Sequence, residues 1–179
     1  MAIKVTTAVG GVVLYDHKVL LVHRASGGRE GDWQIPGGLV DANESLFTAV
    51  CREIMEETST RVKVDGLLAI LNRVLEDENN TYFIFKLNAE DSQIKIDGFE
   101  IDDARYFTLQ EIQDISQLQS LSQLMVTSAL QEKSAVLPIY NHPRIPLDDA
   151  VFCAGNDVAD EFEKLSHLLW YEPNIPKVK

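Results

Sequence analysis

The 179-residue chain has few basic residues and few cysteines. It carries 16 Lys and Arg against 28 Asp and Glu, a formal net charge of −12, and no run of basic side chains. A protein that grips a nucleic-acid backbone or an anionic membrane by bulk charge needs the opposite balance, so we expect neither function. The two cysteines, Cys51 and Cys153, are too few for a disulfide framework and lack paired metal-ligand spacing.

Long apolar runs are also missing from the sequence. No stretch approaches the roughly 20 apolar residues that span a bilayer, and "MAIKVTTAVGGVVLY" has no basic segment leading into an apolar one. We therefore expect a cytoplasmic protein that does not insert into a membrane. A chain with 45% hydrophobic and 25% charged residues at this length suits one globular domain with a sizeable core.

The pattern of apolar residues predicts strands intermixed with helices. "VTTAVGGVVLY" and "KVLLVHR" flank a two-residue turn and predict a hairpin, and "VKVDGLLAILNRV" and "TYFIFKL" predict two more strands. Helical periodicity begins at Ser45, with Asn43 or Ser45 available as the N-cap, and runs for about four turns. A second helical stretch extends from Leu109 to about Glu132, with a break near Ser116. Such a mixture indicates a layered α/β or α+β domain.

The C-terminal part of the chain has a weaker pattern. Beyond Ser134, three prolines predict a loop, which "DVADEFEKLSHLLWY" follows as an amphipathic helix. We therefore predict a domain over residues 1–133 and an extension over residues 134–179 with one helix packed on the same domain. Trp170 and Tyr171 end that helix, and they predict either docking onto the domain or a homodimer contact.

The stretch "GGLVDANESLFTAVCREIMEETS", from Gly37 to Ser59, gathers acids on one helix. Glu53, Glu56 and Glu57 are i, i+3 and i+4 neighbours, so they share one face. Like charges at this spacing destabilise a helix by a few tenths of a kcal/mol per pair, a cost that a divalent cation would remove. Hard carboxylate oxygens suit Mg²⁺ or Mn²⁺ better than zinc. The alternative is a solvated surface face, since such strings of acids are common on surfaces.

A wider pattern of fixed spacing surrounds these acids. Gly38 is followed after five residues by Glu44, and after seven more by Arg52-Glu53-Ile54-Met55-Glu56-Glu57. This arrangement resembles the Nudix box, GX₅EX₇REUXEEXGU with U an aliphatic residue, and the resemblance covers about residues 3–130. Ser59 and Thr60 stand where the family has glycine and an aliphatic residue. The resemblance implies a Nudix-type α/β/α sandwich with a mixed sheet, within the α/β class.

The resemblance also implies a metal site. Glu53, Glu56 and Glu57 would be the metal-binding carboxylates, and the backbone carbonyl of Gly37 would be a further ligand. The implied cofactor is Mg²⁺ or Mn²⁺, and none of the departures from the family pattern removes a ligand.

Other positions of the motif have supporting roles in this interpretation. Gly38 belongs to the turn, and Arg52 with Glu44 would brace the loop against the helix and orient Glu53. Arg24 resembles a family position that contacts substrate phosphate, a role that suits the forked donors of guanidinium, although an Arg at a strand end is often merely solvated.

Two acids are candidates for the catalytic general base. One is Glu53, and the other is Glu100 in "GFEIDD", because Nudix proteins often supply an additional acid from a loop at this point. Glu100 could equally be an exposed loop acid among Asp97, Asp102 and Asp103. Both interpretations stay open at this stage.

The expected function is hydrolysis of a pyrophosphate bond in a nucleoside diphosphate linked to another moiety, with metal as cofactor and a small-molecule nucleotide as partner. A nucleoside triphosphate or a nucleotide sugar is the first choice of substrate. The main alternative is a Nudix-like binding or sensor module without catalysis, although such modules usually lose box acids that this chain keeps. Trp33 could stack on a base, but packing beside the loop is the favoured interpretation.

Overall fold

The computed structural model describes residues 3–27, 30–74, 77–96, 98–131, 137–140 and 151–152. The strands of this part are β1 (Lys4–Tyr15), β2 (Lys18–Arg24), β3 (Trp33–Gln34), β4 (Gly37–Leu39), β5 (Val62–Val74), β6 (Glu78–Ala89), β7 (Ile101–Phe107), β8 (Leu137–Tyr140) and β9 (Val151–Phe152). The helices are α1 (Leu46–Thr58), α2 (Leu109–Gln113) and α3 (Ser120–Leu130). No helix in these ranges is long and apolar enough to cross a membrane.

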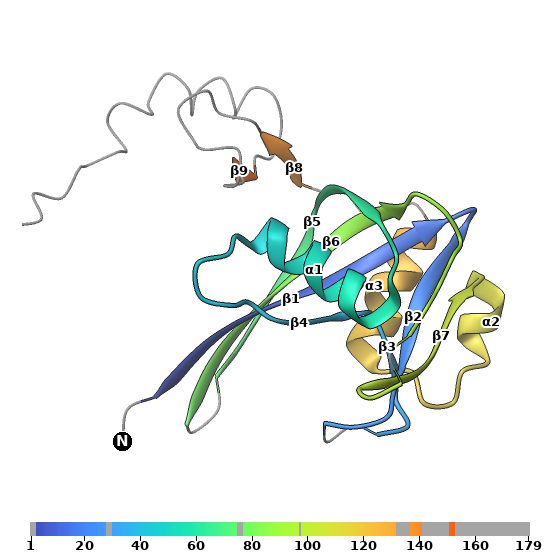
Figure 1. The fold of residues 1–179 in the computed structure, drawn as a ribbon, viewed down its shortest axis with the longest axis horizontal. Coiled ribbons are helices and arrows are strands. Elements are labelled where there is room, and N and C mark those ends of the chain that lie inside the picture. Colours follow the sequence, from blue (N-terminus) through green and yellow to red (C-terminus); the bar gives the residue numbers. More distant parts are fainter. Residues whose placement is uncertain are drawn as a thin grey trace, which may run out of the picture.

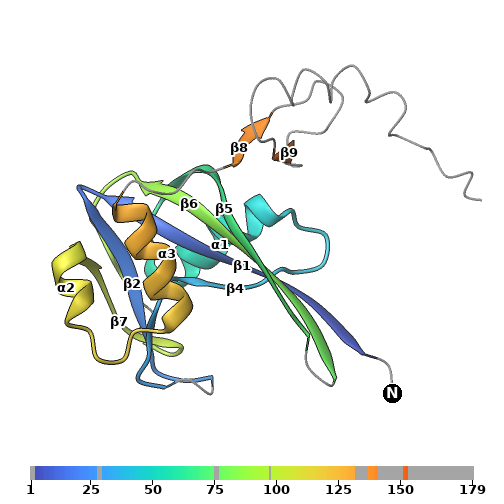
Figure 2. The same ribbon diagram turned by 180° about the vertical axis from the view of Figure 1, so that it is seen from behind.

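The strands form one mixed sheet. Its order is β3-β2-β1-β6-β5-β8-β9, with β4 also paired to β1 and β7 paired to β2. The central pair, β1 and β6, is parallel, whereas the other pairs are antiparallel. Helix α1 lies on one face of the sheet, and α2 and α3 lie on the other (Figures 1 and 2). This arrangement confirms the predicted α/β/α sandwich.

Alternate residues of the central strands build a core on each face. Val9 packs into the cluster that contains Ile54 of α1, whereas Val12 packs into the cluster that contains Ile112 of α2 and Val126 of α3. Successive side chains of a strand point to opposite faces, so a strand covered on both sides reads as a nearly continuous apolar run. This explains "VGGVVLY" and "KVLLV" in the sequence.

The predicted hairpin joins β1 to β2. Asp16 and His17 form its turn with φ of 46° and 59°, and Leu14 pairs with Val19 beside it. Two central residues with positive φ match the right-handed twist of paired strands, which is why so short a loop suffices. The hairpin prediction is confirmed.

Helix α1 begins and ends with specific caps. Its N-cap is Ser45, whose hydroxyl oxygen accepts from the Thr48 N–H at 3.1 Å, so Asn43 does not take this role. At the other end Ser59 adopts a left-handed conformation with φ of 54°, and its N–H donates to the Met55 carbonyl at 2.9 Å. Serine therefore takes the conformation that glycine would favour, at a cost of about 1 kcal/mol.

The second helical stretch is broken as predicted, but the break is longer. Helix α2 ends at Gln113 and α3 begins at Ser120. A capping box starts α2, in which the Thr108 hydroxyl accepts from the Glu111 N–H while the Glu111 carboxylate accepts from Thr108. These local hydrogen bonds fix where α2 begins.

The prediction of a loop after Ser134 is partly wrong. Residues 137–140 form β8, which pairs antiparallel with β5 through Pro138 opposite Gly66 and Leu137 opposite Leu67. Proline lacks an N–H, but one such residue is tolerated in a short strand near a sheet edge. The helix predicted over residues 157–171, with Trp170 and Tyr171, lies outside the described residues. The docking and homodimer hypotheses therefore stay predictions.

Candidate functional site

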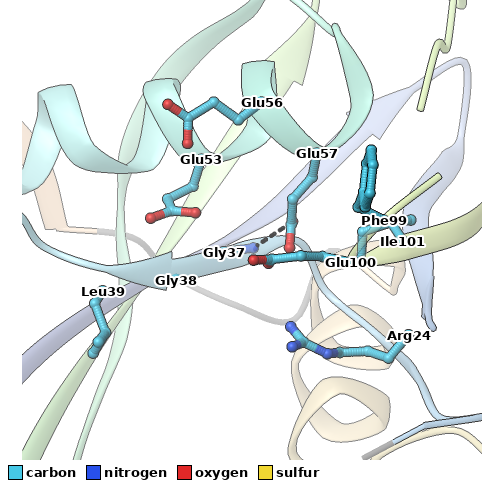
Figure 3. Close-up of a pocket in the computed structure, with 10 residues that line it drawn as sticks. All are labelled: Arg24, Gly37, Gly38, Leu39, Glu53, Glu56, Glu57, Phe99, Glu100 and Ile101. Carbon is cyan, nitrogen blue, oxygen red and sulfur yellow. Dashed lines mark hydrogen bonds between the residues drawn. The ribbon is translucent and has the colours of Figure 1, made fainter. Parts of the chain in front are cut away.

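A cavity of about 710 Å³ opens where α1, β4, the end of β2 and the loop before β7 meet. Figure 3 shows the residues that line it: Arg24, Gly37, Gly38, Leu39, Glu53, Glu56, Glu57, Phe99, Glu100 and Ile101. The structure thus brings most of the predicted site residues to one cavity. Glu44 and Arg52 do not line it but contact residues that do.

Two glycines allow β4 to lie close to its neighbours, Gly37 against β1 and Gly38 against α1. Gly37 has a φ of 150°, and a Cβ at this position would lie 2.2 Å from the Val9 carbonyl oxygen. A Cβ on Gly38 would lie 2.5 Å from a carboxylate oxygen of Glu53. The close approach lets the Gly37 N–H donate to Oε2 of Glu57 at 2.9 Å. The sequence predicted a role for the Gly37 carbonyl as a metal ligand, but it did not predict this hydrogen bond from the Gly37 N–H.

Arg52 links the acids of α1 to the loop that precedes the helix. Its Nη2 and Nε donate to the two carboxylate oxygens of Glu44 at 2.6 and 3.1 Å, and Nη2 also donates to the Leu39 carbonyl. Its Nη1 donates to Glu53 at 2.9 Å and to Glu56 at 3.0 Å. The hydrogen bond from Arg52 lowers the pKa of Glu44, so this pair stays ionised and the two-pronged contact persists.

Glu57 is the most buried acid of the cavity. Its side chain is 7% exposed. Burial raises the pKa of Glu57 to about 8, and the negative charge of Glu53 adds to this shift. The hydrogen bond from the Gly37 N–H and the charge of Arg24 lower the pKa, but they offset the effect of burial only in part. Burial also raises the pKa of Glu53, although Arg52 opposes this shift. Both carboxylates would be stabilised by additional positive charge.

We predict that the metal-free protein loses stability as the pH rises toward 8. The folded state holds a proton on Glu57 that the unfolded chain releases near its ordinary pKa of 4.5, so folding is favoured at low pH. That contribution is lost as the pH rises through about 8. Thermal unfolding in excess chelator should show this decline for the natural protein and a flatter profile for Glu57→Gln. Identical profiles for the two proteins would contradict the buried, protonated Glu57.

The acids are not gathered into a tight cluster. Within the ranges that the structure describes, no three acidic, His or Cys side chains stand close enough together to hold a metal ion. Glu53 and Glu56 accept from Arg52, and Glu57 accepts from Gly37. The donor set nevertheless fits Mg²⁺ or Mn²⁺, because it consists of hard oxygens and includes the buried Glu57 carboxylate, with which no basic side chain of the described residues forms an ion pair.

Arg24 and Glu100 face these acids from another wall. Arg24 ends β2, and its Nε donates to the Ser26 carbonyl at 3.1 Å. The Ala25 N–H donates to the Glu100 carbonyl at 2.8 Å, which holds the loop before β7 beside the end of β2. Figure 3 shows the Glu100 carboxylate directed toward Glu57, with the Arg24 guanidinium nearby. The cavity thus combines an acidic wall, a guanidinium and a loop carboxylate.

Sequence analysis missed the apolar residues of the cavity. Leu39, Phe99 and Ile101 line it, and Phe99 is 81% exposed. None of them stands in a periodic pattern, although Phe99 directly precedes the candidate acid Glu100. The position of Phe99 next to this candidate catalytic acid is the sequence feature that could have indicated an apolar residue at the site.

Trp33 packs away from the cavity. Its ring meets Phe107 edge-on at 5.0 Å between centroids, and the Arg105 guanidinium lies 5.0 Å from the ring centroid. The structure supports the favoured interpretation of packing. Beside it, Nδ1 of His23 lies 2.5 Å from a carboxylate oxygen of Asp102.

Comparison with known proteins assigns the chain to a family. The family model described as NUDIX domain matches residues 4–125. This match covers more than half of the chain, and the chain therefore belongs to the NUDIX family.

Individual relatives agree with this assignment. The chain is 32% identical to a protein of Methanocaldococcus jannaschii named ADP-ribose pyrophosphatase, over 59% of this chain and 63% of that protein. It is 31% identical to Nudix hydrolase 8 of Arabidopsis thaliana, over 58% of this chain and 29% of that protein. The similar region thus spans less than two thirds of either relative.

Solved structures share the fold. A NUDIX hydrolase from Nitrosomonas europaea superposes with a TM-score of 0.63 and 27% identity, covering 74% of each chain. The NUDIX domain of Shewanella oneidensis NrtR, solved in complex with ADP ribose, gives a TM-score of 0.58 over 74% of this chain and 90% of that one. At 20% identity the second likeness concerns the fold alone.

Proposed function

We propose that this chain is a divalent-metal-dependent pyrophosphohydrolase acting on a nucleoside diphosphate linked to another moiety. The observation that carries the proposal is a pair of carboxylates, the partly buried Glu53 and the buried Glu57, which lie over the glycines of β4 and face Arg24 and Glu100 across one cavity. Membership of the NUDIX family supports it.

The chemistry of a pyrophosphate bond explains why these groups are needed. The diphosphate is anionic and repels nucleophiles, so its oxygens must be neutralised and the attacking water activated. When bound, a divalent cation neutralises phosphate oxygens and lowers the pKa of water. Glu53, Glu56 and Glu57 would hold the cation, together with the Gly37 carbonyl. Arg24 would bind phosphate oxygens through its forked N–H donors.

The cavity also accommodates a substrate of the proposed size. Its volume of about 710 Å³ lies within the range of nucleotide and drug-sized pockets, roughly 300–1,000 Å³. A nucleoside triphosphate and a nucleotide sugar remain the first choices. The name of the Methanocaldococcus jannaschii relative adds ADP-ribose, which is a nucleoside diphosphate linked to a sugar.

Between the two candidates for the general base, the contacts favour Glu100. The Glu53 carboxylate accepts a hydrogen bond from Arg52, which stabilises its charged form and engages one of its oxygens. The Glu100 carboxylate makes no hydrogen bond or ion pair with the residues that the structure describes. We therefore assign Glu100 the removal of a proton from the attacking water, and Glu53 the binding of the cation.

Two variants separate these roles. Glu100→Gln should lower kcat by about 10²- to 10³-fold and leave the Mg²⁺ concentration for half-maximal activity unchanged, because only a proton acceptor is lost. Glu53→Gln should raise that Mg²⁺ requirement. Steady-state rates over a range of Mg²⁺ concentrations measure both, with Glu90→Gln, an exposed acid outside the cavity, as control. A Glu100→Gln enzyme with natural kcat would exclude this assignment.

The competing function is a module that binds a nucleotide without cleaving it. The NUDIX domain of NrtR, which has a similar fold, was solved in complex with the nucleotide ADP ribose. The retention of Glu53, Glu56 and Glu57 favours the enzyme, because a binding module has no need for three acids beside an anionic ligand.

A substrate screen tests the proposal. Purified protein is incubated with ADP-ribose, nucleotide sugars and nucleoside triphosphates in Mg²⁺ or Mn²⁺, and released nucleoside monophosphate or phosphate is measured. Turnover should stop with excess chelator and return with Mg²⁺ or Mn²⁺ but poorly with Ca²⁺, whose looser coordination suits the site less well. Full turnover in chelator would refute metal dependence, and tight binding without turnover would favour the binding module.

A further inference from the structure

Phe99 places an exposed aromatic ring at a cavity whose other lining residues include four acids and Arg24. The ring is 81% exposed and is the aromatic member of the residues that line the cavity. Figure 3 shows it at one side of the cavity, next to Ile101 and to the backbone that carries Glu100. Exposing so much apolar surface is unfavourable, so a ligand that covered the ring would gain binding free energy.

The backbone around Phe99 is held by the segment at the end of β2. The Ser26 hydroxyl donates to the Phe99 carbonyl at 3.5 Å, and the Ala25 N–H donates to the next carbonyl, that of Glu100, at 2.8 Å. Directly afterwards Ile101 pairs with Arg24 in the sheet. These contacts set the position of the ring relative to the guanidinium that would bind phosphate.

We propose, building on the function proposed above, that Phe99 is a specificity-determining residue whose ring stacks on the base of a nucleoside diphosphate. The phosphates would lie between Arg24 and the acids of α1, and the base would reach the edge of the cavity where the ring stands. Base–aromatic stacking is tolerant of base identity, because every base has a π face. The substrate class is therefore a nucleoside diphosphate derivative. Binding requires a nucleobase, but any of the bases can stack on the ring.

The charge of the chain makes such a contact useful. At a net charge of −12 the protein repels an anionic substrate at long range, and the acids of the cavity add to this repulsion before a cation binds. Stacking is independent of net charge, so it adds affinity for nucleotides over inorganic phosphates without further cations in the site.

Binding measurements test this role without relying on turnover. ADP, UDP and inorganic pyrophosphate are titrated in Mg²⁺ into the natural protein, Phe99→Ala and Phe99→Tyr. Phe99→Ala should weaken ADP and UDP about tenfold and change pyrophosphate by less than about twofold, because only the base loses its partner. Phe99→Tyr should bind all three like the natural protein. Leu124→Ala, which removes a 61% exposed apolar side chain from α3, is the matched control.

Steady-state kinetics provide the second measurement. For a nucleotide substrate that the natural protein cleaves, Phe99→Ala should raise KM about tenfold and leave kcat nearly unchanged, as expected for an interaction made equally in ground and transition states. Equal weakening of ADP and pyrophosphate, or unchanged ADP binding, would overturn the stacking role. A natural protein that binds ADP through Phe99 but cleaves nothing would refute the proposed hydrolysis and leave this inference standing.

Discussion

Replacing Glu57 with Gln is expected to lower kcat by about three orders of magnitude while the fold survives. The amide keeps the shape of the side chain, and its oxygen can still accept from the Gly37 N–H that now donates to Oε2 at 2.9 Å. What is lost is the negative charge that the most buried acid of the site would carry with the cation bound, and with it a ligand for the cation on which the reaction depends.

The response to metal separates this effect from general damage. Added Mg²⁺ should raise the melting temperature of the natural protein by mass action and raise that of Glu57→Gln much less. Glu90→Gln, with its exposed side chain outside the cavity, should match the natural protein in kcat and in its response to Mg²⁺. Equal activity and equal Mg²⁺ response in all three proteins would show that Glu57 does not bind a catalytic cation.

Local periodicity explains what could be predicted from the sequence. The spacing of Glu53, Glu56 and Glu57 places them on one face of any helix, whatever the remainder of the chain does. The Ser45 cap and the hairpin turn at Asp16 likewise depend on neighbours in the sequence. Each of these features uses contacts between residues a few positions apart, so a short stretch of sequence contains the information.

The features that could not be predicted depend on distant segments. The burial of Glu57, and hence its raised pKa, requires β4 to pass beneath α1, with the Gly37 N–H reaching a residue 20 positions away. The exposure of Phe99 at the cavity depends on the pairing of β7 with β2. Pro138 predicted a loop because local rules disfavour proline in a strand, whereas the available edge of β5 allowed β8 to form.

The other large expected effect is the loss of stability when Gly37 is replaced by Ala, for which Gly98 provides the comparison. Gly37 and Gly98 both have positive φ, 150° and 81°, so an Ala at either site is strained by its backbone conformation. Only Gly37 is also crowded, since its Cβ would lie 2.2 Å from the Val9 carbonyl oxygen and 2.7 Å from the Cα of Gly10. A Cβ on Gly98 meets nothing within 4 Å among the residues that the structure describes.

Gly37→Ala is therefore expected to cost about 3–5 kcal/mol in the free energy of unfolding, against about 1 kcal/mol for Gly98→Ala. Both neighbours of Gly37 are backbone atoms of β1, the central strand, so relief requires β4 to move away from β1. That movement would separate the Gly37 N–H from Glu57 and open the acidic wall of the cavity. Urea unfolding of both variants, followed by circular dichroism, measures the difference. If the two variants lose equal stability, the cost lies in the backbone conformation alone, and the close approach of β4 to β1 is not what holds the Gly37 N–H beside Glu57.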